Sequence, residues 1–79
     1  MFIQIALGVI EFQALNAAID EKDPLRRSFD EACTPRERQS FLGCWVDVDI
    51  GALDHLLKLA REFAPSAVPA IENAIERRN

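Results

Sequence analysis

The sequence predicts an α+β domain in which two short antiparallel strands form a small sheet, covered on one face by about five short helices. Three observations predict this class: two runs of alternating apolar and polar residues, several stretches with helical spacing, and a length of 79 residues. We expect one domain over residues 1–79. A chain this short buries only about 60% of its unfolded surface, so its core is marginal and we expect a homo-oligomer.

The first predicted strand is Phe2–Leu7, "FIQIAL". Every second residue from Ile3 onward is isoleucine or leucine, which is typical of a strand with one buried face. Gly8 ends this strand. Residues 9–22 then place apolar side chains three and four positions apart and predict an amphipathic helix.

Two further helices are predicted in the middle of the chain. Asp23-Pro24 is a typical helix start, because aspartate accepts from free amides and proline loses no hydrogen bond there, so we expect a helix over 24–33. Thr34 to Glu37 has the pattern of a capping box, in which each side chain bonds the other residue's amide. It predicts a third helix from Pro35 to about Leu42.

The second predicted strand follows Gly43 and spans residues 44–50, "CWVDVDI". Its alternation separates an apolar face from a mixed one. The apolar face carries Val46, Val48 and Ile50, and the other carries Trp45, Asp47 and Asp49. Residues 52–64 predict an amphipathic helix closed by Pro65, and Ser66 is expected to cap a final helix.

The order strand, glycine, helix, turn and helix occurs twice, over about residues 2–33 and 45–78. Neither unit can bury its apolar stripe alone, which favours a pseudo-twofold domain. The predicted helix over 35–42 has no counterpart in this repeat.

Composition and motifs argue against several functions. Nine basic against thirteen acidic residues give a net charge of -4, which disfavours a direct nucleic-acid partner. Cys33 and Cys44 lack metal-ligand or redox spacing, and phosphate loops and nucleophile elbows are absent. Asp47 and Asp49, roughly 7 Å apart on a strand, have no third ligand indicated by spacing. We expect no catalytic residues, no cofactor and no metal.

The apolar start of the chain, "MFIQIALGVI", has no basic region before it and meets Glu11 after ten residues. It resembles neither a signal peptide nor a membrane span. We therefore expect a cytoplasmic protein without a membrane partner.

The candidate partner-binding site is the sheet face turned away from the helices. It would carry Phe2, Gln4, Trp45, Asp47 and Asp49. Exposed aromatic residues are typical of interface centres, and unpaired strand edges invite pairing with another chain. The alternative is that Phe2 and Trp45 fold over the sheet edge and pack against a helix end.

Three functional hypotheses follow. The first is a small non-catalytic interaction module, homodimeric through the Phe2 and Trp45 face or through strand pairing, that binds another protein. The second is an acidic inhibitor that occupies a basic nucleic-acid-binding site on a partner. The third is an accessory subunit of a multi-protein enzyme, for which no residue argues either way.

Overall fold

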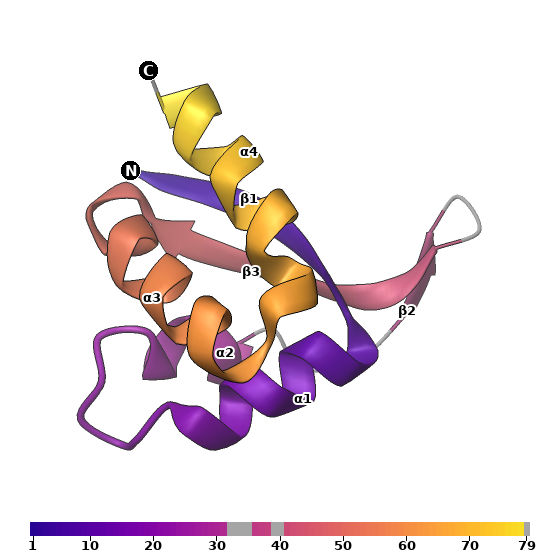
Figure 1. Cartoon of the computed structure of the whole chain (residues 1–79), viewed down its shortest axis with the longest axis horizontal. Helices are drawn as coiled ribbons and strands as arrows, with labels where there is room; N and C mark the ends of the chain where they lie inside the picture. The colour runs from indigo at the N-terminus through magenta and orange to yellow at the C-terminus, as the bar shows by residue number, and fades with distance from the viewer. Residues whose placement is uncertain (32–35, 39–40, 79) are drawn as a thin grey trace.

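The computed structural model describes residues 1–31, 36–38 and 41–78. Along the chain, one strand and two helices are followed by two strands and two further helices, and two 3-10 turns, Ile50–Ala52 and Pro65–Ala67, precede the last two helices (Figure 1). The elements are β1 (Phe2–Gly8), α1 (Val9–Ala18), α2 (Arg26–Glu31), β2 (Arg36–Arg38), β3 (Phe41–Asp49), α3 (Leu53–Phe63) and α4 (Val68–Arg78). The predicted α+β class is confirmed.

The strands form one sheet in the order β1-β3-β2, with both pairs antiparallel. β1 pairs with β3 along its whole length, from Phe2 opposite Asp49 to Gly8 opposite Gly43. The predicted antiparallel pairing of the two main strands is therefore confirmed. β2 is short and pairs only with the first residues of β3.

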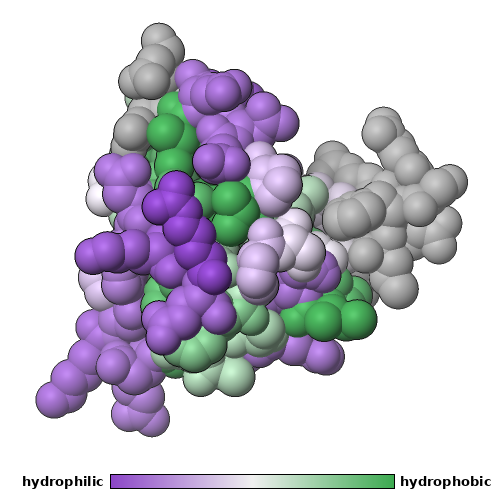
Figure 2. All heavy atoms as spheres, viewed as in Figure 1, coloured by the Kyte–Doolittle hydropathy of each residue, from purple (hydrophilic) through white to green (hydrophobic). Residues whose placement is uncertain are grey.

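The inner face of the sheet carries the core. Packed against it are α1 and α4, and α3 packs in turn against these two helices. Their buried residues include Leu15, Leu56 and Ile71, each without exposed surface. From the predicted apolar face the sheet contributes Ile5, Leu7, Val46 and Val48, together with Cys44. Ile50 was expected in the second strand, but it is only half-buried and begins the 3-10 turn after β3. The outer side of these helices is mostly hydrophilic, with separate hydrophobic areas (Figure 2).

The third predicted helix is wrong. Arg36–Arg38 is a strand, and β3 already begins at Phe41, where a helix ending near Leu42 was expected. The Thr34 half of the proposed capping box and Pro35 lie outside the described residues. A capping box stabilises a helix by only about 1 kcal/mol, and a helix of eight residues is marginal without tertiary packing. Pairing of this segment with β3, which is rich in aromatic and β-branched residues, competes with helix formation.

Turn chemistry shortens the first two helices. α1 ends at Ala18 rather than Lys22, because buried Ile19 is extended and Asp20 accepts from the amide of Lys22 at 2.9 Å. Asp23 accepts from the amide of Leu25 at 2.8 Å, as expected of a helix start, and α2 begins at Arg26. The predicted extension of α2 to Cys33 lies outside the described residues.

The second half follows the predicted order more closely. α3 ends at Phe63, before Pro65, and Ser66 lies inside the 3-10 turn that leads into α4. The order strand, helix, helix occurs as β1-α1-α2 and as β3-α3-α4. The pseudo-twofold relation between these units stays a prediction. No helix in the described ranges is both long and apolar enough to cross a bilayer.

Candidate functional site

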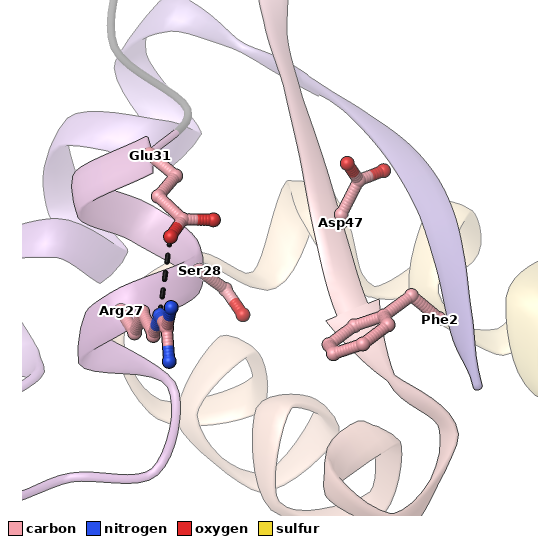
Figure 3. A pocket seen from close by; sticks show the side chains of 5 residues that line it. All are labelled: Phe2, Arg27, Ser28, Glu31 and Asp47. Carbon is pink, nitrogen blue, oxygen red and sulfur yellow. Dashed lines mark hydrogen bonds and ion pairs between the residues drawn. The ribbon is translucent and has the colours of Figure 1, made fainter.

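A groove runs between α2 and the outer face of the sheet. Its first part has a volume of about 390 Å³. Phe2 of β1 and Asp47 of β3 form one side, and Arg27, Ser28 and Glu31 of α2 form the other (Figure 3). The groove thus joins segments distant in the sequence.

A second hollow of about 460 Å³ shares Phe2, Arg27 and Ser28 with the first and continues towards the start of α3. There it is lined by Asp49 and His55, among others. We call the combined surface the outer groove; its polar and aromatic members are Phe2, Arg27, Ser28, Glu31, Asp47, Asp49 and His55.

Phe2 is the main apolar group of the outer groove. Strand alternation directs its side chain away from the core, and the ring points across β3 towards α2 (Figure 3). The side chain is 65% exposed, so it does not pack against a helix end as the alternative hypothesis required. Its position offers a large apolar surface to a partner.

The other sequence-predicted site residues divide into two groups. Asp47 and Asp49 are exposed and line the outer groove with Phe2. Gln4 is exposed on the same face opposite Asp47 in the strand register, but it does not line the groove. Trp45 is only half-buried and borders a recess of about 30 Å³ beside Ser28.

α2 holds its position through two buried residues on its core side. Leu25, just before the helix, and Phe29 are 1% and 2% exposed. The Phe29 ring stacks on Phe12 of α1, with centroids 5.2 Å apart and an interplanar angle of 19°. This packing fixes the wall of the outer groove to the core.

Arg26 ties α2 to the end of α1. Its Nη1 donates to the carbonyls of Asn16 at 3.2 Å and Ile19 at 2.9 Å, and its Nη2 donates to the Asn16 side chain. Nη2 also lies 3.0 Å from the carboxylate of Asp30. Cations near a helix C-terminus are favourable because carbonyls there have no helical partner. Arg26 therefore joins the two helices electrostatically.

The groove carries more acidic than basic groups. Arg27 and Glu31 form an ion pair of 3.1 Å, with side chains 89% and 68% exposed, so the pair itself stabilises little. Asp49 accepts from the amide of Gly51 at 2.9 Å and so caps the turn after β3. Asp47 is exposed on β3, across the groove from Arg27 and Glu31 (Figure 3). The groove combines an aromatic ring with several carboxylates.

His55, which lines the outer groove, joins α3 to the loop between α1 and α2. The Nε2 atom of His55 lies 2.8 Å from Oδ2 of Asp23, whose side chain is 13% exposed. Burial raises the pKa of Asp23, but hydrogen bonds from His55 and Leu25 and the positive charges of His55 and Arg26 outweigh it. The pKa of Asp23 is therefore held below its ordinary value of 3.8.

This lowered pKa makes Asp23 a source of acid-dependent stability. A carboxyl with a lower pKa in the folded state stabilises the fold above its unfolded pKa, and this contribution disappears as the pH falls through the folded value. We expect Asp23→Asn, which keeps a cap acceptor, to reduce the free energy of unfolding at neutral pH by about 1 kcal/mol. Urea unfolding of both proteins from neutral to strongly acidic pH measures this difference in the free energy of unfolding. The difference should become smaller when the pH falls below the ordinary pKa of Asp23.

Asp47→Asn is the matched control, because Asp47 is exposed on the sheet and has the same chemistry. It should change stability little at any pH. A difference between wild type and Asp23→Asn that persisted unchanged at strongly acidic pH would contradict the proposed role of the charge.

Cysteine and serine are the nucleophilic side chains to consider near the outer groove. Cys44 is a free, fully buried cysteine, and burial raises the pKa of its thiol above 9.0. Ser28 lines the same hollow as His55, but the imidazole bonds Asp23, and the hydrogen bonds found in the described part of the chain do not join it to Ser28. Among the same residues, no group of three or more His, Cys, Asp and Glu side chains could hold a metal ion.

Comparison with known proteins was made at three levels. No family model, curated protein or solved structure matches this chain. The functional interpretation therefore depends on the geometry of the outer groove.

Sequence patterns identified only one side of this groove. The spacing of Arg27, Ser28 and Glu31 places them on one side of α2, but helical spacing alone does not show which element this side faces. The missing information was tertiary: α2 packs beside β3 and so faces the outer side of the sheet.

Proposed function

We propose that this protein is a non-catalytic interaction module that binds a partner protein through the outer groove. The observation that carries this proposal is the position of Phe2, a 65% exposed aromatic residue shared by both hollows of the groove. Large aromatic residues in the centre of a concave surface are typical binding hot spots. A partner that covered Phe2 would gain about 2 kcal/mol from this side chain alone.

The groove also indicates the chemistry of the partner. Asp47, Asp49 and Glu31 border the Phe2 ring, and Arg27 is already paired with Glu31. An apolar side chain that packs on Phe2, next to a lysine or arginine that reaches Asp47, complements this surface. We therefore propose a partner segment with an apolar residue beside a basic one.

A second candidate function is inhibition of a basic nucleic-acid-binding site on a partner. It is favoured by the same acidic border together with the net charge of -4. Salt separates the two candidates, because contacts between exposed charges are screened and apolar packing is not. Affinity that falls steeply with salt supports inhibition by charge, whereas affinity that depends mainly on Phe2 supports the interaction module.

The experiment compares proteins that co-purify with wild type and with two groove variants, Phe2→Ser and Asp47→Arg. Each variant should reduce capture of the specific partner by roughly tenfold or more, because one removes the apolar anchor and the other reverses the charge at position 47. The amount of captured partner is measured by quantitative mass spectrometry.

Two control variants make the same chemical changes outside the groove. Ile10→Ser removes an apolar side chain of α1 that is 78% exposed, and Glu62→Arg reverses an exposed charge on α3. Both should retain the partner. If the controls lose the same proteins as the groove variants, or if the groove variants lose none, the outer groove is not the binding site.

A further inference from the structure

The outer edge of β1 is the longer of the two sheet edges that the described residues leave without a further strand, the other being the edge of the three-residue β2. In the order β1-β3-β2, β2 pairs with the start of β3 on the side away from β1, and α2 also contacts β3. β1 has β3 on one side only. α4 packs on β1 and crosses in front of it in Figure 1, without adding a strand.

The backbone groups along this edge follow from two observed hydrogen bonds. The amide of Ile50 donates to the carbonyl of Met1 at 3.0 Å, which directs Met1 towards β3. Because antiparallel strands alternate, odd-numbered residues of β1 bond β3 and even-numbered residues point their amides and carbonyls outward. The contact from Arg77 Nη2 to the carbonyl of Gln4 agrees with this alternation.

β1 lacks the features that usually protect such an edge. Edges are commonly protected by charged side chains, proline or a bulge. The strand "FIQIALG" contains neither charge nor proline, and its register with β3 is continuous over seven residues. Its outward-facing backbone is therefore suited to accept another strand.

We propose that this edge pairs antiparallel with β1 of a second copy of the chain, about a two-fold axis at Gln4, and joins two three-stranded sheets into one. A second copy fits because β1 is neutral, so that self-pairing brings no like charges together, and because both edges offer the same outward-facing groups. Both copies use the same β1 edge in this two-fold contact, so the pairing closes at a dimer.

The register is chosen by the two ends of β1. Gly8 is the N-cap of α1, and an N-cap carbonyl accepts the first helical hydrogen bond, which removes it from the free edge. A two-fold axis at Gln4 uses only Phe2 to Ala6, with Phe2 opposite Ala6 of the other copy and Gln4 opposite itself. In this register the inner faces of both sheets lie on the same side. Ile3, which is only partly buried, then lies next to Ile5 of the other copy and becomes less exposed.

Arg77 competes with this pairing. Its bond to the Gln4 carbonyl is long, at 3.5 Å, and exposed, so a partner amide displaces it at little cost. The dimer does not depend on the outer groove, because β1 contributes its backbone edge to the dimer and the Phe2 side chain to the groove.

The test uses light scattering and sedimentation equilibrium on wild type, Gln4→Lys, Gln4→Glu and a mixture of the two variants. Wild type should dimerise. Each variant alone should dimerise roughly tenfold more weakly, because like charges face each other at the axis, and the mixture should form a heterodimer at least as tight as wild type. Gln13→Lys and Gln13→Glu, exposed on α1, are the matched controls and should leave dimerisation unchanged.

A backbone variant gives a second, independent readout. Ala6→Pro removes an outward-facing amide and leaves the ladder to β3 intact, so the monomer should stay folded by circular dichroism and dimerise roughly thirtyfold more weakly. Arg77→Ala should strengthen the dimer. A wild-type protein that stays monomeric, or a dimer insensitive to both the Gln4 charges and Ala6→Pro, overturns the proposal.

Discussion

Replacing Phe29 by alanine is expected to reduce the free energy of unfolding by about 3–5 kcal/mol. Phe29 is 2% exposed and stacks on Phe12, so its removal leaves a cavity between α2 and α1. Because small domains have only about 5–15 kcal/mol of stability in total, this loss is a large share. Urea unfolding followed by circular dichroism measures it.

Phe63→Ala is the matched control, because Phe63 at the end of α3 is 47% exposed. The same chemical change there should cost clearly less than half as much. If both variants lost the same stability, the packing described between α1 and α2 would be wrong.

Replacing Arg26 by alanine is expected to reduce the free energy of unfolding by about 2–3 kcal/mol. The guanidinium donates to the carbonyls of Asn16 and Ile19 and pairs with Asp30, so one side chain connects α2 to the end of α1. Arg26→Lys keeps the charge but loses the forked geometry, and it should recover only part of the stability. Chemical unfolding of the three proteins at low and high salt measures these differences.

The neighbouring Arg27→Ala is a direct control. Arg27 is 89% exposed and makes one surface ion pair with Glu31, so this change should cost less than about 0.5 kcal/mol. Equal losses at positions 26 and 27 would mean that the bond to α1 contributes nothing beyond an ordinary surface charge.

The predicted fold was most accurate where the alternation or spacing of apolar residues was strong. The inner stripe of Ile5, Leu7, Val46 and Val48 is buried as predicted, since only one face of a strand can meet the helices. The prediction failed at Arg36–Arg38 and at Phe41, because a local capping pattern indicated a helix and did not account for the pairing between β2 and β3.

The sequence predicted the strand side of the candidate site but not the helix side. Strand alternation was sufficient to place Phe2, Asp47 and Asp49 on one outer face. The other wall, including Arg27 and Ser28, depends on where Phe29 anchors α2, and that contact with Phe12 is tertiary. Periodicity identifies the buried side of a helix but not the element that covers its flank.

The most direct test of the proposed binding role is site-specific photo-cross-linking in the cells that make the protein. A photoreactive phenylalanine replaces Arg27, in the outer groove, and in a second variant it replaces Arg61, an exposed arginine of α3 outside it. The proposal predicts one defined cross-linked protein from position 27 and none from position 61. Cross-linking that is absent from position 27, or identical from both positions, would contradict it.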